Sequence, residues 1–229
     1  MNIAPASPFG FANSLRMPNA THLRLKVCGL RQAENILEVA GLEPDFLGFI
    51  FTPKSKRFVG EELSGELLRS LPAGVRKVGV FVDQSVAEIM QQVRRYGLDL
   101  VQLHGAEPPA QCAALRANDV GVIKAFAVAD AVDFAALEPY VPFCDYFLFD
   151  AAGPQPGGNG TRFSWELLRR YNLPVPYLLA GGIGPGMAAE LARLDLPGLY
   201  GLDVNSGFEI APALKDADRL REFFTELQG

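Results

Sequence analysis

The sequence predicts a single-domain α/β protein, a (β/α)8 barrel of the TIM type, and three observations lead to this fold class. Apolar runs typical of strands alternate eight times with amphipathic segments typical of helices. The repeats are evenly spaced from residue 24 to residue 227, and no Ser/Gly linker marks a domain boundary. The 229 residues, 49% of them hydrophobic, can bury one full core. Two small domains or a doubly wound sheet are the alternatives, but such a sheet rarely has eight evenly spaced units.

The first four units are short apolar strands, each followed by a segment with the apolar period of a helix. The first strand ends on a cysteine and is stopped by a glycine. The expected pairs of strand and helix are 24–28 with 32–40, 46–51 with 60–70, 77–81 with 85–96, and 100–103 with 108–116.

The last four units are less regular. The fifth helix has a weak pattern, and a long glycine-rich loop follows the sixth strand. The expected pairs are 122–127 with 131–140, 146–149 with 164–170, 177–180 with 185–193, and 198–202 with 212–227.

Residues 1–22 differ from the repeating part of the chain. They contain Pro5, Pro8 and Pro18 and a single charged residue, Arg16. They lack the cationic start and the apolar region of a secretory signal. We therefore expect a flexible or surface-draped extension at 1–22 and the barrel domain at 23–229.

Composition excludes several classes of function. Lys and Arg total 21 against 26 Asp and Glu, a net charge of -5 without a long basic run, which argues against nucleic-acid binding. No stretch reaches the roughly 18 apolar residues of a membrane span, so we expect a soluble protein without a membrane partner. Three cysteines without a signal peptide indicate reduced thiols and a cytoplasmic location.

Polar residues on the strands are informative, because a barrel buries both faces of each strand and a buried polar group needs a partner or a ligand. Pairs two positions apart point to one side of a strand. These pairs are Lys26 with Cys28, Gln102 with His104, and Asp203 with Asn205. With Lys124 and Asp150 they are expected to form a polar layer near the C-terminal rim, where barrel active sites lie.

Two of these residues have competing interpretations. Cys28 by local pattern alone is a buried hydrophobe, whereas a thiol beside the amides of a helix start has a lowered pKa and is available for chemistry. Lys26 would neighbour Asp203 once the barrel closes, and the pattern supports an ion pair and a catalytic role equally.

Glycine-rich turns after the last two strands predict a phosphate site. Ala-Gly-Gly-Ile-Gly at 180–184 follows the seventh strand, and Asn-Ser-Gly at 205–207 follows the eighth. Loops at these places on barrels commonly bind phosphate, because unpaired amides and a helix dipole converge there. Glycine is also the default residue of tight turns, so neither element is specific alone.

Taken in order, the motifs resemble those of phosphoribosylanthranilate isomerase, a family of tryptophan biosynthesis, from about Leu25 to the C-terminus. They are Lys-Val-Cys-Gly at 26–29, Gly-Phe-Ile-Phe at 48–51, Lys-Ser-Lys-Arg at 54–57, Val-Gly-Val-Phe-Val at 78–82, Val-Gln-Leu-His-Gly at 101–105, Asp150 with Gly-Gly-Asn-Gly at 157–160 and Phe-Ser-Trp at 163–165, Ala-Gly-Gly at 180–182, and Asp-Val-Asn-Ser-Gly-Phe-Glu at 203–209.

The resemblance implies an aldose–ketose isomerase that needs no cofactor or metal. It would convert N-(5-phosphoribosyl)anthranilate to 1-(2-carboxyphenylamino)-1-deoxyribulose 5-phosphate by an Amadori rearrangement. By the same resemblance Asp150 is the general acid and Cys28 the general base. A carboxyl buried at a strand end can have a raised pKa and a thiol at a helix start a lowered one, in keeping with these roles. A helix or turn cap is the alternative for Asp150.

The resemblance also implies the ligand contacts. Arg57 would pair with the anthranilate carboxylate, although a solvated basic turn is the alternative. Residues 157–160 would belong to a mobile lid. The family usually has a small hydroxyl residue where Asn205 stands. The expected substrate-binding residues are Arg57, Gln102, His104 and Asp203, and the expected phosphate-binding residues are Gly181, Gly182, Asn205, Ser206 and Gly207.

Two other functions fit the same fold. The first is that of the histidine-pathway aminoaldose isomerase. That family is characterised by a pair of carboxylates, which would leave Cys28 unexplained. A barrel that binds a phosphate ligand without catalysis is the other. For the favoured isomerase, we expect the phosphosugar–anthranilate substrate as the partner and a monomeric protein.

Overall fold

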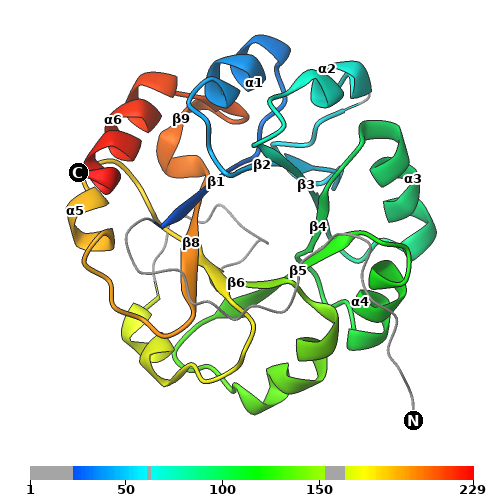
Figure 1. The fold of residues 1–229 in the computed structure, drawn as a ribbon, viewed down its shortest axis with the longest axis vertical. Coiled ribbons are helices and arrows are strands. Elements are labelled where there is room, and N and C mark those ends of the chain that lie inside the picture. Colours follow the sequence, from blue (N-terminus) through cyan, green and yellow to red (C-terminus); the bar gives the residue numbers. More distant parts are fainter. Residues whose placement is uncertain (1–22, 61–62, 153–162) are drawn as a thin grey trace.

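The computed structural model describes residues 23–60, 63–152 and 163–229. The expected extension at 1–22 lies outside these residues and stays a prediction. Eight parallel strands form a closed barrel in sequence order, and β8 pairs with β1 (Figure 1). The predicted (β/α)8 barrel is therefore confirmed. The strands are β1 Arg24–Cys28, β2 Phe46–Ile50, β3 Arg76–Phe81, β4 Leu100–Leu103, β5 Gly121–Val128, β6 Tyr146–Ala151, β7 Tyr177–Leu179 and β8 Leu199–Val204.

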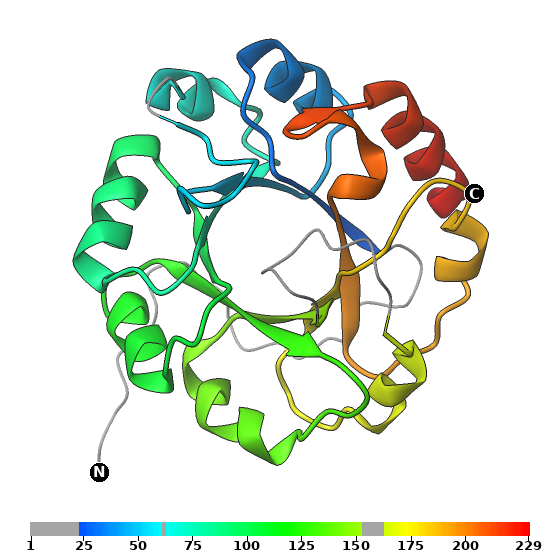
Figure 2. The same ribbon diagram turned by 180° about the vertical axis from the view of Figure 1, so that it is seen from behind.

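Helices surround the barrel on its outside, as both end views show (Figures 1 and 2). In the described part of the chain, no helix is long and apolar enough to cross a membrane. The helices, with η for the 3-10 type, are α1 Ala33–Ala40, α2 Gly65–Ser70, α3 Val86–Tyr96, α4 Pro109–Arg116, η1 Ala135–Phe143, η2 Trp165–Arg170, α5 Ala188–Leu191, η3 Ser206–Phe208 and α6 Ala217–Gln228.

Several expected helices are shorter than predicted or of a different type. The fifth unit has the 3-10 helix η1, because Pro139 and Pro142 inside it lack the amide that an α-helix requires. Helix α2 begins five residues later than expected, at Gly65, where the Ser64 side chain accepts a hydrogen bond from the Leu67 amide at 3.2 Å.

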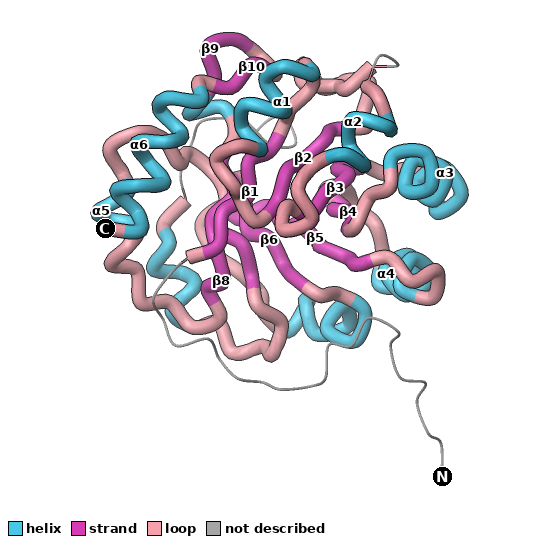
Figure 3. Tube along the Cα trace, turned by 45° about the horizontal axis from the view of Figure 1, so that its top comes forward, coloured by secondary structure: helices cyan, strands magenta, loops and turns pink. Residues whose placement is uncertain are grey.

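The expected helix at 212–227 is wrong at its start. Residues Glu209–Ala211 (β9) and Leu214–Lys215 (β10) instead form an antiparallel hairpin, which lies beside α1 (Figure 3). Ala213 between the two strands has a φ of 67°, a left-handed conformation that ends regular structure. Helix α6 then begins at Ala217, after Asp216 caps it.

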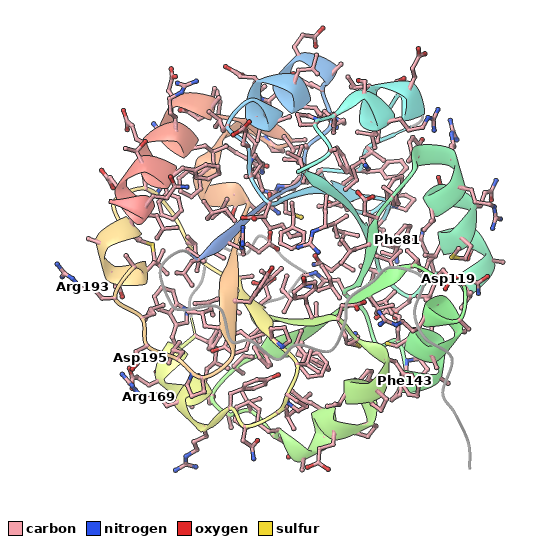
Figure 4. All side chains as sticks on the ribbon, in the orientation of Figure 1. Phe81, Asp119, Phe143, Arg169, Arg193 and Asp195 are labelled. Carbon is pink, nitrogen blue, oxygen red and sulfur yellow. The ribbon has the colours of Figure 1, made fainter. Side chains whose placement is uncertain are left out.

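Apolar side chains form two core layers. One fills the barrel interior, and the other lies between the strands and the helices and includes Phe81. Arg193 and Asp195, in contrast, project outward from the surface (Figure 4). The inner layer consists of Phe46, Val78, Leu100, Ile123, Ala125, Leu148, Leu178 and Ala180, with Tyr146 and Tyr200 against it.

The alternation of side chains along the strands decides which polar groups face inward. Val27 belongs to the outer layer, so Lys26 and Cys28 on either side of it face the barrel interior. The expectation for Lys124 is wrong. Its neighbours Ile123 and Ala125 belong to the inner layer, so Lys124 points outward to the helices.

Candidate active site

The Lys26–Asp203 ion pair closes the inner layer of polar groups at the junction of β1 and β8. The two residues are register partners in the closed barrel. The Lys26 Nζ atom lies 2.9 Å from each oxygen of Asp203, and both side chains are buried. Burial opposes the charge on Lys26, but the Asp203 carboxylate outweighs it and raises the pKa of the ammonium. The ion pair thus forms, and the expected substrate contact of Asp203 stays a prediction.

The Cys28 thiol lies at the C-terminal end of β1 and faces the barrel interior. Its environment differs from the one expected. Burial raises the pKa of this thiol, and the nearby Lys26 ammonium opposes the rise. The amides that follow it, of Gly29 and Leu30, donate to the Gly48 carbonyl at 2.9 and 3.2 Å, and α1 begins only at Ala33. The expected lowering of the thiol pKa by a helix start is therefore wrong.

Gly48 makes room for the thiol. A Cβ atom at this position would stand 2.7 Å from the Cys28 Sγ atom. Only glycine lets β2 pass so close to the sulfur.

Gln102, His104 and Asp150 meet at the ends of β4 and β6. The Gln102 amide Nε2 donates to His104 Nδ1 at 2.9 Å, so the proton of a neutral imidazole is on Nε2. That Nε2 atom lies 3.4 Å from Asp150 Oδ2, while Asp150 Oδ1 accepts from the Ala151 amide at 2.9 Å. The structure therefore brings together two expected substrate-binding residues and the expected acid. Gln102 itself is buried and reaches the site through His104.

Arg57 follows β2 and lies at the rim, largely buried. Its Nε and Nη2 atoms donate to the two Glu209 oxygens at 2.8 and 2.7 Å. This hydrogen bonding raises the pKa of the guanidinium. The alternative of a solvated basic turn is wrong, because a bidentate pair with 14% exposure of the Arg57 side chain is a built contact.

The loops after β7 and β8 touch each other, as the phosphate hypothesis requires. A Cβ atom on Gly207 would lie 2.3 Å from the Ile183 carbonyl oxygen. Gly181 and Gly182 have φ values of 87° and 66°, which favour glycine. The helix behind them is weaker than expected, since α5 is a single turn beginning at Ala188.

The remaining phosphate candidates, Asn205 and Ser206, are at the end of β8. The Asn205 Oδ1 atom accepts from Lys215 Nζ at 2.7 Å, so its oxygen is already engaged. Ser206 opens the short helix η3. The expected lid at 157–160 lies outside the described residues.

Two residues at this rim, Glu209 and Lys215, were not predicted as site residues. Glu209 appeared only as the end of a motif, and Lys215 fell within the helix expected at 212–227. Pro212 is the signal that could have revealed them, because proline favours turns. It separates a short segment that carries the negative Glu209 from one that carries the positive Lys215.

The class of protein follows from these features: a (β/α)8-barrel enzyme with a thiol and a carboxyl facing its interior and an arginine at its rim. A family model described as N-(5'phosphoribosyl)anthranilate (PRA) isomerase matches residues 25–226. The chain belongs to this isomerase family, which acts in tryptophan biosynthesis.

Relatives and solved structures agree with this assignment. The N-(5'-phosphoribosyl)anthranilate isomerase of Phocaeicola vulgatus is 41% identical over 204 residues, 89% of this chain and 97% of the relative. A structure of monomers generated from the dimeric Thermotoga maritima isomerase is 30% identical, with a TM-score of 0.75 over 90% of this chain and 99% of that one. A structure of a phosphoribosyl anthranilate isomerase in complex with reduced 1-(o-carboxyphenylamino)-1-deoxyribulose 5-phosphate is 31% identical, with a TM-score of 0.75 over 90% of this chain and 99% of that one.

No group of three or more His, Cys, Asp and Glu side chains suited to a metal ion occurs among the residues that the structure describes.

Proposed function

We propose that this chain converts N-(5'-phosphoribosyl)anthranilate to 1-(2-carboxyphenylamino)-1-deoxyribulose 5-phosphate, with Asp150 as general acid and Cys28 as general base. The observation that carries the proposal is that both side chains face the interior of the same barrel at its C-terminal end, in a chain of this isomerase family. The ligand of the solved relative, a reduced form of this product, supports the substrate class.

The steps need one proton given and one proton taken. Asp150 donates a proton to the furanose ring oxygen as the C1–O bond breaks, which opens the ring to a Schiff base. The Cys28 thiolate then removes the C2 proton, and the resulting enolamine tautomerises to the ketone. His104 Nε2, 3.4 Å from Asp150 Oδ2, keeps the acid oriented toward the ring.

The ligand contacts complete the proposal. Arg57 would receive the anthranilate carboxylate, and His104, Gln102 and Asp203 would line the sugar. The phosphate would lie between the loops after β7 and β8, at Gly181, Gly182, Asn205, Ser206 and Gly207, because glycine lets the backbone of a loop approach an anion closely.

The test follows anthranilate fluorescence as purified protein meets phosphoribosylanthranilate. We expect rapid loss of the substrate signal beyond the rate without protein. Binding of the substrate without acceleration would favour the non-catalytic barrel. Turnover of the histidine-pathway aminoaldose in place of this substrate would favour the other isomerase.

Lys26 is expected to set the pH at which the base becomes active. Its ammonium is the largest influence that lowers the Cys28 pKa, so Lys26→Met should raise that pKa further. Since a base works deprotonated, the acidic limb of kcat/KM should move to higher pH. The measurement is the pH profile of kcat/KM, with circular dichroism to show that the barrel is folded. A limb that stays in place would mean that Lys26 serves only the ion pair.

The two phosphate loops offer a second prediction. Gly207→Ala would place a methyl group 2.3 Å from the Ile183 carbonyl oxygen and force the loops apart. We expect KM to rise by about tenfold or more, with a smaller change in kcat, because the loops hold the ligand at a distance from the reacting atoms. The control is Gly74→Ala, where a Cβ atom meets nothing within 4 Å. An unchanged KM in Gly207→Ala would remove these loops from the phosphate site.

We also infer a monomer in the cytoplasm. Large exposed hydrophobic residues in the described ranges are only Leu37 and Ile210, which form no extended apolar patch. The cysteines Cys28, Cys112 and Cys144 are free thiols, which suits a reducing compartment. Light scattering tests the monomer against the dimeric state of the Thermotoga maritima relative.

A further inference from the structure

A cluster of charged side chains supports Arg57 from behind, and we call it the rim charge cluster: Arg57, Glu209 and Lys215. Glu209 bonds Arg57 with both oxygens, and its Oε1 atom also accepts from Lys215 Nζ at 2.7 Å. Lys215 in turn donates to Asn205 at Oδ1 (2.7 Å) and at the carbonyl oxygen (3.2 Å). One carboxylate therefore lies between two cations.

Charge balance gives Lys215 a role that Arg57 alone cannot fill. Arg57 and Glu209 together are neutral, and a neutral pair attracts a carboxylate weakly. Lys215 brings the cluster to a net charge of +1. The neighbouring Lys26–Asp203 pair is neutral, and so is the Cys28 thiol while it is protonated, so neither changes this balance.

We propose that Lys215 is a positioning residue that keeps the rim charge cluster net positive, so that Arg57, held in place by Glu209, selects ligands that carry an aryl carboxylate. The inference rests on the proposed function, in which Arg57 receives the anthranilate carboxylate. It adds two residues from the hairpin to the specificity of the site.

The cluster is held from two parts of the barrel, helix α1 and the turn after β1. The Asn35 side chain on α1 accepts from the Lys215 amide at 2.7 Å and donates to its carbonyl at 2.9 Å, which ties the hairpin to the first helix. Gly29, with a φ of 81°, lies under the cluster, where a Cβ atom would stand 2.7 Å from both Arg57 Cδ and Asn205 Oδ1. The arginine stem thus passes directly over the residue after Cys28.

The remaining donors of Arg57 are the ones a ligand would use. Glu209 occupies Nε and one hydrogen of Nη2. In the described part of the chain, the guanidinium makes no other hydrogen bond that competes for Nη1. A planar fork fixed along one edge presents its other edge in a single orientation, which suits a carboxylate.

The experiment compares two inhibitors: reduced 1-(o-carboxyphenylamino)-1-deoxyribulose 5-phosphate and the same compound without its carboxyl group. The ratio of their dissociation constants, measured by calorimetry, reports the contribution of the carboxylate. Lys215→Met leaves the cluster neutral, so we expect this ratio to fall by about tenfold, the value of one charge-assisted hydrogen bond.

The double variant Lys215→Met/Glu209→Gln separates charge balance from packing. It removes one charge of each sign and returns the net charge to +1, so it should recover most of the lost selectivity. If the cluster served only to stabilise the fold, the double variant should be worse than Lys215→Met alone, because two buried charged partners would then be lost instead of one. If Lys215→Met does not fold, Lys215→Gln keeps a donor for Glu209 and removes the charge.

The matched control is Lys124→Met, which breaks another buried Lys–Glu pair, Lys124 with Glu107 at 3.0 Å. It should lower the melting temperature and leave the ratio unchanged. An unchanged ratio in Lys215→Met, or a double variant no better than the single one, overturns the proposal. Because the ratio is a binding measurement, it tests the cluster even if wild-type protein fails to turn over the substrate, and that failure would count against the proposed function alone.

Discussion

Replacing Cys28 with serine is expected to reduce kcat/KM by about 10²- to 10⁴-fold, the contribution commonly attributed to one general base. Serine keeps nearly the same size and position, but its hydroxyl is far less acidic than a thiol and does not ionise in the working range. Gly48 leaves only enough room for the sulfur, with 2.7 Å to a would-be Cβ, so the smaller oxygen fits without repacking. Stopped-flow or steady-state fluorescence assays measure the loss of kcat/KM.

The pH profile gives this prediction a second readout. Burial raises the pKa of Cys28, so the acidic limb of kcat/KM should lie above the ordinary thiol pKa of about 8.5. The sign follows from the role: activity requires thiolate and is lost as pH falls through the raised pKa. Cys28→Ser should lose this limb entirely.

The control for the thiol is Cys112→Ala. Cys112 is also fully buried, but on α4 outside the candidate site. It should lower stability and leave kcat/KM near the wild-type value. Near wild-type turnover in Cys28→Ala would rule out the proposed base, because Cys28 is the inward-facing thiol of the first strand.

Asp150→Asn should abolish nearly all turnover, with a loss similar in size or larger. Asparagine preserves the shape and can still accept from the Ala151 amide at 2.9 Å, but it has no proton to donate to the furanose oxygen. Steady-state measurement of kcat/KM on the variant and on the wild type gives the size of the loss.

Asp145→Asn is the matched control, since Asp145 precedes the same strand at its opposite end. It accepts from the Val122 amide at 2.8 Å and pairs with Arg116, so its replacement should cost stability and spare turnover. If Asp150→Asn retained its activity, the acid would have to be sought at His104, whose Nε2 atom lies 3.4 Å away.

The barrel and much of its site could be predicted from the chain because both depend on short-range patterns. Strand runs and helix periods defined the eight units, and the spacing of Lys26 and Cys28 correctly placed both on one face of β1. The closure of β8 on β1 follows from the order of the units, so the Lys26–Asp203 contact could be predicted from the sequence.

What could not be predicted depends on the surroundings in three dimensions. The raised pKa of Cys28 reflects burial by other strands, which no local motif describes. Lys124 faces outward because strand phase is set by its neighbours Ile123 and Ala125, not by its polarity. Lys215 was hidden because the hairpin that carries it interrupts what resembled one continuous helix.

The Lys26–Asp203 pair also constrains how the protein reaches its native state. Its members are separated by 177 positions, so during synthesis the ammonium is made long before its partner. Enclosing Lys26 without Asp203 would leave an uncompensated charge in the interior, at a cost of about 3–5 kcal/mol. Folding intermediates that lack β8 should therefore keep the first strand solvated, and final closure of the ring should be a late, cooperative event dominated by this long sequence separation. Until β8 docks on β1, the Cys28 thiol would also lack its native surroundings. Catalytic activity would therefore appear only after the last strand has been synthesised.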